Sequence, residues 1–416
     1  MKQSEQSVCL VIGASHAGSL LVVQLRKEGW QGRIILIGAE SHLPYHRPPL
    51  SKAVLAGERS LENILLRPEM LYSNNQIELR LGERVVSLDR AAKRVQLASG
   101  EALSYDKLAL CTGASPRVLP MANDLPGVFT LRQADDVMAI RQAMASGKRA
   151  VVIGGGYIGL EVAAVMSEQG LQVTVVEASE RLLQRVASPV ISDYFRLLHE
   201  SHGVNVLTSD SVTDIHHEQG ALQIHLADGT LKEADLVIVG IGVVPETTLA
   251  LQAGLDVEDG IVVTPYMQTS DPDIVAAGDC VQFPSARYGR CLRLESVQNA
   301  LDQARVAAGT LCGQPQVYDS LPWFWSDQYD CKLQSAGLRL EHEHEIVRGN
   351  PSAIDGEGLA VFYLRGDRMI AADCVNRAKE FMACKRLIAE RLPVNLAALA
   401  DESLSPEHFE QTQEPV

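Results

Sequence analysis

The stretch VVIGGGYIG at residues 151–159 joins an apolar strand to a glycine-rich turn that opens into a helix. In a dinucleotide-binding fold, the first glycine makes the tight turn and the second lets the backbone approach a pyrophosphate. The third allows the helix to pack closely on the strand. Gly154, Gly156 and Gly159 occupy these three places. The stretch therefore predicts a βαβ unit that binds a dinucleotide.

An acidic residue follows where this fold needs one. Glu177 ends the next predicted strand, residues 172–177, and a carboxylate there can accept hydrogen bonds from both hydroxyls of a ribose. None of residues 178–180 is basic, so a 2′-phosphate would be repelled. We therefore predict NADH, rather than NADPH, as the dinucleotide of this unit.

A second, less complete turn lies near the N-terminus, in the stretch VIGASHAG at residues 11–18. Gly13 and Gly18 fill the first and third places, but Ser15 replaces the second glycine. The position that matches Glu177 is Gly38, so Glu40 is the nearest acid for a ribose. Two such turns in one chain indicate two dinucleotides, which is what hydride transfer between a nicotinamide and a flavin requires.

Length and charge exclude several classes of protein. A chain of 416 residues is too long for one ordinary core, so two or three domains are expected. A net charge of −15 argues against nucleic acid as the main partner. The apolar runs are of strand length, well below the roughly 20 residues of a membrane span. The polar start MKQSEQS lacks a signal-peptide core, so we expect a cytoplasmic protein with no membrane partner.

No metal site is predicted from the cysteines or the histidines. The eight cysteines form no CxxC or zinc-ligand spacing, and most lie in apolar strand-like runs. The string EHEHE at residues 341–345 invites a metal interpretation, because an extended segment would place both histidines on one face. We interpret it instead as a solvated strand edge.

Three further strings carry a resemblance to a known family: RPPLSK at residues 47–52, LCTG at 110–113 and AAGDC at 276–280. Together with both glycine turns, they resemble the flavoproteins with two dinucleotide-binding domains. The string PWFWSDQYD at 322–330 narrows the resemblance to the ferredoxin reductases of bacterial haem monooxygenase and ring-hydroxylating dioxygenase systems, the putidaredoxin reductase type. The likeness runs from about residue 8 to residue 401.

The resemblance implies an α/β fold of two Rossmann-like domains, with the NAD domain inserted into the FAD domain, and a C-terminal α+β domain. We place the FAD domain at residues 1–115 and 245–320, the NAD domain at 116–244 and the C-terminal domain at 321–416.

The resemblance also implies residue roles. Lys52 is expected beside flavin N5, where a cation would favour the reduced, anionic ring. Glu161 could pair with Lys52 near the nicotinamide, or could be an ordinary surface glutamate. Trp325 is expected over the flavin-side cleft, with core packing as the alternative, and these three form the expected catalytic set. The further expected cofactor-binding residues are Gly13, Ser15, His16, Ala17, Gly18, Glu40, Arg47, Pro49, Val85, Thr112, Gly113, Arg132, Gly154, Gly156, Tyr157, Ile158, Gly159, Glu177, Gly242, Gly278, Asp279, Glu295, Ser296 and Val297.

The implied activity is transfer of hydride from NADH to FAD, followed by transfer of single electrons to a two-iron two-sulfur ferredoxin that feeds an oxygenase. The first predicted domain has no cysteine between Cys9 and Cys111, so a thiol relay is not expected. The alternatives are a rubredoxin reductase, an NADH oxidase, or a redox-sensing interaction protein like apoptosis-inducing factor. We expect a monomer, with a weak dimer as the alternative, and a basic docking patch at Arg287, Arg290, Arg293 and Arg305.

Overall fold

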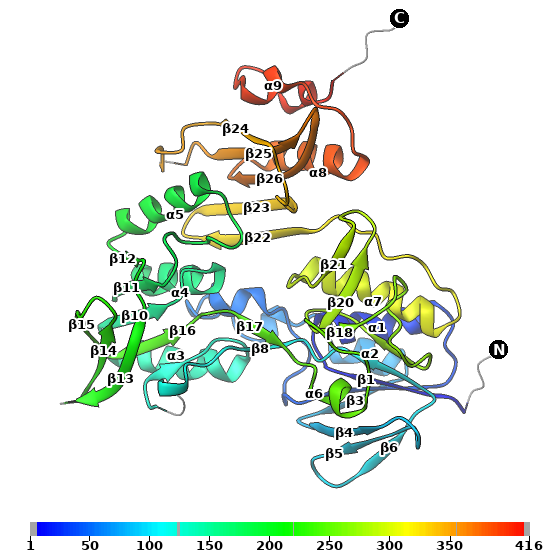
Figure 1. Cartoon of the computed structure of the whole chain (residues 1–416). Helices are drawn as coiled ribbons and strands as arrows, with labels where there is room; N and C mark the ends of the chain where they lie inside the picture. Colours follow the sequence, from blue (N-terminus) through cyan, green and yellow to red (C-terminus); the bar gives the residue numbers. More distant parts are fainter. Residues whose placement is uncertain (1–5, 123–124, 219, 355, 412–416) are drawn as a thin grey trace, which may run out of the picture. The chain divides into compact units, whose positions relative to one another are not determined.

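The computed structural model describes residues 6–122, 125–218, 220–354 and 356–411 (Figure 1). It divides into two compact units. Unit 1 comprises Met1–His46, Ser60–Ser115 and Val243–Ser320. Unit 2 comprises Arg47–Arg59, Pro116–Gly242 and Leu321–Val416. Within the described ranges, no helix is long and apolar enough to cross a membrane.

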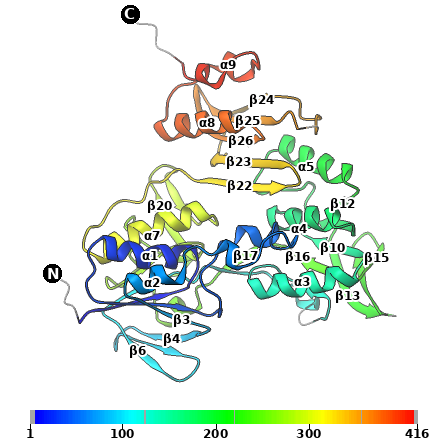
Figure 2. The same cartoon turned by 180° about the vertical axis from the view of Figure 1, so that it is seen from behind.

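Unit 1 is built on a parallel sheet, as the βαβ pattern predicts. Its five strands run in the order β19 (Ile274–Ala276), β7 (Lys107–Leu110), β1 (Val8–Ile12), β2 (Arg33–Gly38) and β3 (Ile77–Leu81). The central strands are almost continuously apolar and buried, as expected of a sheet covered on both faces. Helices α1 (His16–Lys27) and α7 (Val297–Leu311) pack side by side, which Figure 2 shows from behind.

Smaller elements complete unit 1. Two antiparallel or mixed three-stranded sheets contain β4 (Val85–Asp89), β5 (Arg94–Leu97) and β6 (Ala102–Ser104), and β18 (Ile261–Val262), β20 (Val281–Ser285) and β21 (Arg290–Leu292). The short helices are η2 (Glu62–Ile64), α2 (Glu69–Asn74) and α6 (Thr248–Gln252). A two-stranded pair is formed by β8 (Ala114–Pro116) and β17 (Val243–Pro245).

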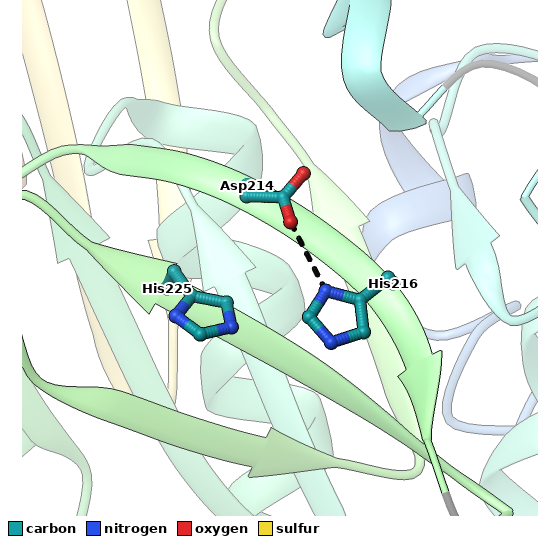
Figure 3. A group of neighbouring side chains, drawn as sticks. All are labelled: Asp214, His216 and His225. Carbon is teal, nitrogen blue, oxygen red and sulfur yellow. Dashed lines mark hydrogen bonds and ion pairs between the residues drawn. The ribbon is translucent and has the colours of Figure 1, made fainter.

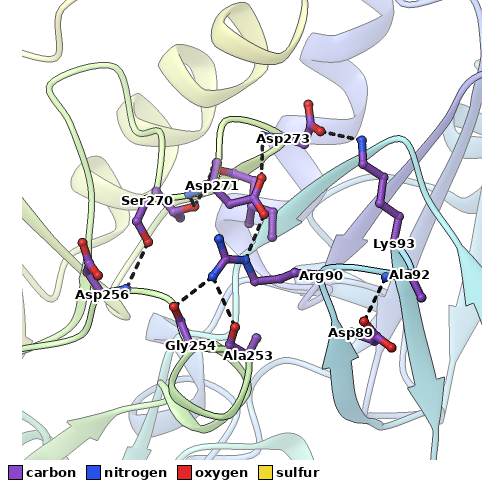
Figure 4. Close-up of polar contacts among 12 residues, drawn as sticks. Asp89, Arg90, Ala92, Lys93, Ala253, Gly254, Asp256, Ser270, Asp271 and Asp273 are labelled. Atoms are coloured by element: carbon purple, nitrogen blue, oxygen red, sulfur yellow. Dashed lines mark hydrogen bonds and ion pairs between the residues drawn. The ribbon is translucent and has the colours of Figure 1, made fainter.

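An arginine in the β4–β5 turn joins two segments of unit 1 that lie far apart in sequence (Figure 4). The Arg90 Nε lies 2.9 Å from an oxygen of Asp271, and its Nη1 donates to the carbonyl of Gly254 at 2.9 Å. The Arg90 side chain is 30% exposed and that of Asp271 is 17% exposed. Nearby, Lys93 pairs with Asp273 at 2.5 Å, but the Lys93 side chain is 46% exposed.

Replacing Arg90 by alanine is expected to lower the free energy of unfolding by about 1–3 kcal/mol, because a half-buried acceptor set loses its charged donor. The Lys93→Ala variant removes a more exposed ion pair and should cost about 1 kcal/mol or less. Urea denaturation of both variants measures the difference. An equal loss of unfolding free energy in both variants would contradict the claim that Arg90 stabilises unit 1 by joining its two distant segments.

Unit 2 begins with a second parallel sheet. Its order is β12 (Asn205–Thr208), β11 (Gln172–Glu177), β10 (Arg149–Ile153), β16 (Leu236–Val239) and β9 (Val128–Phe129). The helices of this part are η1 (Pro48–Ser51), η3 (Pro120–Ala122), α3 (Ala134–Ser146), α4 (Tyr157–Glu168) and α5 (Pro189–Ser201). An antiparallel meander of β13 (Val212–Glu218), β14 (Ala221–Leu226) and β15 (Leu231–Ala234) contributes its apolar face to the same core.

The rest of unit 2 is the predicted C-terminal α+β part. Its antiparallel sheet has the order β22 (Trp323–Gln328), β23 (Cys331–Gly337), β26 (Arg368–Val375), β25 (Leu359–Arg365) and β24 (His344–Arg348). Helix α8 (Ala378–Glu390) packs on β26 and β23 and closes a separate apolar core with α9 (Leu396–Ala400) and η4 (Pro406–Phe409). The α/β fold with a C-terminal α+β part is therefore confirmed.

One face of β22 packs on the helices of the preceding part. Phe324 lies against Tyr157 of α4, with ring centroids 4.5 Å apart, and the Gln328 amide oxygen lies 2.8 Å from Nε2 of His199 on α5. Burial lowers the pKa of His199 from 6.5 to about 4. The imidazole is therefore neutral in the folded protein at neutral pH.

This burial predicts a pH dependence of stability. The unfolded chain binds the proton near pH 6.5, whereas the folded chain binds it only near pH 4. The contribution of the neutral, buried His199 to the free energy of unfolding is thus complete above pH 6.5 and is lost as the pH falls toward 4. It amounts to about 2 kcal/mol between pH 7 and pH 5. The His199→Gln variant should lose that part of the pH dependence in denaturation curves, whereas His202→Gln, on the exposed helix end, should keep it.

The string EHEHE does not form one extended segment. Only His344 and Glu345 belong to β24, and Glu341 has a left-handed backbone with φ of 55°. The ring of His342 lies outside the strand and contacts Glu345 through Nε2 at 3.0 Å. The metal interpretation therefore loses its premise of two histidines on one strand face, because a turn interrupts the alternation. The interpretation as a solvated strand edge holds for His344, which is exposed on the edge strand β24.

Candidate nucleotide sites and the lysine–glutamate pair

The glycine turn of unit 2 has the geometry that a dinucleotide needs. Gly154 has φ of +107°, and a Cβ there would lie 2.5 Å from the carbonyl oxygen of Gly240. A Cβ at Gly159 would lie 2.2 Å from the carbonyl oxygen of Gly154, so helix α4 could not pack so closely on β10 with any other residue. These two glycines shape the turn itself.

Gly156 serves a different purpose. It is the N-cap of α4, its φ of −84° suits any residue, and a Cβ there would meet no atom of the described residues within 4 Å. The first turn of α4 is uncharged, and Ile158 is 45% exposed. Open space before a helix N-terminus is where backbone N–H groups and the helix dipole favour an anion. The turn fits a pyrophosphate.

Glu177 lies at the carboxyl end of β11 and is fixed against this turn. One carboxylate oxygen accepts the N–H of Gly155 at 2.6 Å, and the other accepts the N–H of Ser179 at 2.7 Å. The carboxylate therefore has a fixed place beside the turn. Gly242, which follows β16, has φ of +100° and accepts the N–H of Arg117 through its carbonyl at 2.9 Å.

The glycine turn of unit 1 is equally tight. Gly13 has φ of +111°, and a Cβ there would lie 2.0 Å from the carbonyl oxygen of Cys111. A Cβ at Gly18 would lie 2.0 Å from the carbonyl oxygen of Gly13. Ser15 is the N-cap of α1, and His16 and Ala17 begin the helix. The replacement of the second glycine by serine has thus left the turn intact.

Several other predicted residues gather at the carboxyl edge of this sheet, the edge at which such folds bind ligands. Thr112 and Gly113 follow β7, and the Thr112 hydroxyl donates to the carbonyl of Glu246 at 2.6 Å. Gly278 and Asp279 follow β19, and a Cβ at Gly278 would come within 3.5 Å of the Ala17 methyl group. These segments therefore bring two glycines with positive φ, Gly113 and Gly278, and the acid Asp279 to this edge.

The remaining unit 1 candidates differ in setting. Glu40 follows β2 and accepts a hydrogen bond from the hydroxyl of Tyr45. Ser296 caps α7 before Val297, and Glu295 pairs with Arg293 at 2.6 Å. Val85 is only 8% exposed and belongs to the apolar core.

The predicted pair of Lys52 and Glu161 is formed within unit 2. Lys52 Nζ lies 2.6 Å from a carboxylate oxygen of Glu161, and the Glu161 side chain is only 2% exposed. The Ser51 hydroxyl donates to the same oxygen at 2.5 Å, and the Ser326 hydroxyl donates to the other oxygen at 2.6 Å. Glu161 is therefore not an ordinary surface glutamate.

Three segments build this arrangement. The short helix η1 starts at Pro48 and ends at Ser51, so Lys52 follows it directly. Helix α4 carries Glu161, and strand β22 carries Ser326. A buried carboxylate is costly unless it is paired and hydrogen-bonded, and here one ammonium and two hydroxyls satisfy it. The Lys52 side chain is 19% exposed, so the lysine of this pair reaches solvent while the carboxylate of Glu161 stays buried.

Ser51 and Ser326 are not among the predicted site residues. Both lie inside the strings RPPLSK and PWFWSDQYD, and the alternation of β22 provides the signal for Ser326. Phe324 and Gln328 of that strand face α4 and α5, so the residue between them must face the same way.

Trp325 points to the other face of β22. Its ring is 5.5 Å from that of Trp323, which packs on Phe381 of the C-terminal core at 6.1 Å. Arg47 and Arg132 lie together, since the Arg47 guanidinium donates to the carbonyl of Arg132. The structure thus joins Lys52 with Glu161 but places Trp325 on the opposite side of its strand from Ser326.

The two parallel sheets, each with a tight glycine turn before a helix N-terminus, have the architecture of a protein with two dinucleotide-binding folds. Comparison with known proteins agrees. A family model for pyridine nucleotide-disulphide oxidoreductases matches residues 7–304, and a model for the reductase C-terminal domain matches residues 323–406. The chain belongs to the pyridine nucleotide-disulphide oxidoreductase family, and within it to the ferredoxin reductases, as predicted. Membership implies a flavin and a nicotinamide nucleotide as the two bound groups.

The similar proteins align over almost their whole length. Putidaredoxin reductase CamA of Pseudomonas putida is 43% identical over 402 residues, which cover 95% of this chain and 94% of that protein. The ferredoxin reductase subunit of 5,5′-dehydrodivanillate O-demethylase from a Sphingobium species is 43% identical over 397 residues, covering 94% and 96%. The covalent putidaredoxin reductase–putidaredoxin complex contains a chain with a TM-score of 0.92 at 42% identity, covering 97% of this chain and 98% of that one.

Proposed function

We propose that this enzyme takes hydride from NADH onto FAD and passes single electrons to a two-iron two-sulfur ferredoxin that serves an oxygenase. The observation that carries the proposal is the pair of glycine turns combined with the buried Lys52–Glu161 pair. The flavin supplies the conversion between a two-electron donor and a one-electron acceptor. The protein binds, orients and tunes the two groups.

In this proposal, unit 1 binds FAD through the turn at Gly13 and the carboxyl-edge residues up to Asp279, with Glu40 as the acid available to the adenosine ribose. Unit 2 binds NADH through the turn at Gly156, with Glu177 accepting the ribose hydroxyls. Hydride transfer requires the nicotinamide carbon and flavin N5 to approach within about 3–3.5 Å. Lys52 provides positive charge where the reduced ring gains electrons, and Glu161 holds its ammonium in place.

The cysteines support direct exit of electrons from the flavin. All eight are free thiols, and Cys111 and Cys280, which lie next to the predicted FAD residues, are buried. Burial raises the pKa of both thiols, so neither is a ready thiolate. The family model is named for disulphide oxidoreductases, but we propose that electrons leave the flavin of this chain without passing through these buried thiols.

The choice of a ferredoxin as acceptor rests on the relatives, which are named as reductases of putidaredoxin and of an oxygenase system.

The predicted basic patch offers less unpaired positive charge than a count of its arginines suggests. Arg293 is only 13% exposed and pairs with Glu295 and Asp259, and Arg305 pairs with Asp302. Arg290 and Arg305 are nevertheless exposed, so the docking patch stays a prediction. Steady-state turnover with ferredoxin, rubredoxin and O₂ compares the candidate acceptors, and ferredoxin should be reduced fastest.

The coenzyme preference gives a separate prediction. Wild-type enzyme should favour NADH over NADPH, and Glu177→Ala should lower kcat/KM for NADH by about 10- to 100-fold, because two charge-assisted hydrogen bonds are lost. The kcat/KM for NADPH should stay the same or rise, since the repulsion of the 2′-phosphate is removed. Glu180→Ala is the matched control, as Glu180 is exposed and lies three residues further on. Equal losses with both coenzymes would show that Glu177 only holds the turn.

A further inference from the structure

A group of metal-binding side chains lies away from both nucleotide turns, on the antiparallel meander of unit 2 (Figure 3). Asp214 and His216 belong to β13, and His225 belongs to β14. Each can offer one ligand atom, and these atoms lie within 4.8 Å of one another. Among the described residues, these are the three His, Cys, Asp or Glu side chains whose ligand atoms come close enough together to share one metal ion.

The strand register explains why the three side chains meet. Asp214 and His225 are direct cross-strand partners, and His216 is two residues further along β13 on the same face. Ile215 and Ile224, which are partners on the other face, are buried in the core and fix the hairpin. The two histidine rings are stacked, with their centroids 5.2 Å apart and their planes tilted by 22°, so both imidazoles lie on the same face of the meander.

The distances suit a single ion. Ligands on one Zn²⁺ lie about 3–4 Å apart, since each bond is about 2 Å long. Asp214 Oδ2 and His216 Nδ1 are already 3.0 Å apart. Small rotations of the exposed and half-buried side chains would bring the third ligand within reach, with no movement of the strands.

We propose that Asp214, His216 and His225 form a binding site for a divalent transition-metal ion of the Zn²⁺ class. Two imidazoles and one carboxylate suit Zn²⁺, Ni²⁺ and Cu²⁺, whereas Mg²⁺ and Ca²⁺ prefer sets made of oxygen alone. The site is open to solvent, so water can complete the coordination. The bound ion would cross-link β13 to β14 and stabilise the hairpin.

Zinc titration of chelator-treated, flavin-loaded protein by calorimetry tests the proposal. A Cys291→Ser background is used, because Cys291 is an exposed thiol that could bind zinc by itself. We expect one zinc per chain with a dissociation constant of about 1 μM, and no heat with Mg²⁺. His216→Ala and His225→Ala should each weaken binding by at least about tenfold. His217→Ala is the matched control, since His217 is the next residue on β13 but lies on the opposite face and bonds to the carbonyl of Pro126.

A second measurement identifies the ligands directly. Cobalt bound in place of zinc should give d–d absorption bands without a sulfur-to-metal charge-transfer band, and these bands should vanish in the His216→Ala/His225→Ala double variant. NADH-dependent turnover should be the same in all variants, so the result is independent of the proposed function. Zinc binding of undiminished strength in the double variant, or no binding at millimolar zinc, would overturn the proposal.

Discussion

Replacing Lys52 by methionine is expected to slow the reduction of bound flavin by NADH about 100-fold. Methionine keeps most of the side-chain volume but removes the ammonium that lies 2.6 Å from the buried carboxylate of Glu161. A fixed charge placed where charge develops contributes about 10²–10³ in rate. Anaerobic stopped-flow absorbance, which follows the loss of the oxidised flavin band, measures the step. The exposed Lys148 provides a control, and Lys148→Met should react like the wild type.

The same substitution leaves Glu161 without its cation, and removal of one partner from a buried pair costs about 3–5 kcal/mol of stability. The two effects can be separated. In the double variant Lys52→Met/Glu161→Gln, the neutral amide no longer needs a counter-ion, so most of the stability should return. The rate should stay low, because the ammonium is still missing. A double variant that regained both stability and rate would show that the pair only supports the fold.

Replacing Gly156 by valine is expected to raise the KM for NADH by about 10- to 100-fold while leaving the protein folded. The backbone at Gly156 suits any residue, and the space beside it holds no atom of the described residues within 4 Å. The Cβ of the valine would therefore meet no described atom within 4 Å, and the side chain would fill the space proposed for the pyrophosphate. Gly156→Ala should give a smaller increase of the same kind.

Gly159→Ala provides the contrast. Its Cβ would lie 2.2 Å from the carbonyl oxygen of Gly154, so the helix must shift. That variant should lose about 4 kcal/mol of stability or more, or fail to fold. Thermal unfolding and the retention of flavin absorbance distinguish the two outcomes. If Gly156→Val destabilised the protein as much as Gly159→Ala, the space beside Gly156 would have no special relation to a ligand.

The parts of the fold that depend on local sequence could be predicted. Both βαβ units follow from apolar strands and from glycines whose Cβ atoms would collide with neighbouring carbonyl groups, as at Gly13 and Gly154. The turn chemistry at Glu341 was not visible in an alternating string of glutamate and histidine.

The parts that depend on contacts between distant segments could not be predicted from spacing alone. Glu161 is buried because β22 reaches α4 from 165 residues away and brings Ser326. The predicted FAD domain includes the segment Arg47–Arg59, but this segment groups with unit 2, where Lys52 pairs with Glu161 and Arg47 donates to Arg132. The Asp214 cluster needed the exact register of a hairpin.

The central claim is that electrons pass from NADH through the flavin directly to a one-electron acceptor. The most direct measurement is sequential-mixing stopped flow: one equivalent of NADH reduces the enzyme anaerobically, and a two-iron two-sulfur ferredoxin is then added. We predict reoxidation of the flavin at the rate of ferredoxin reduction, two ferredoxins reduced per NADH, and no change after alkylation of the exposed thiol of Cys291. Flavin that stays reduced with ferredoxin but is rapidly reoxidised by O₂ or by a disulfide would contradict the account.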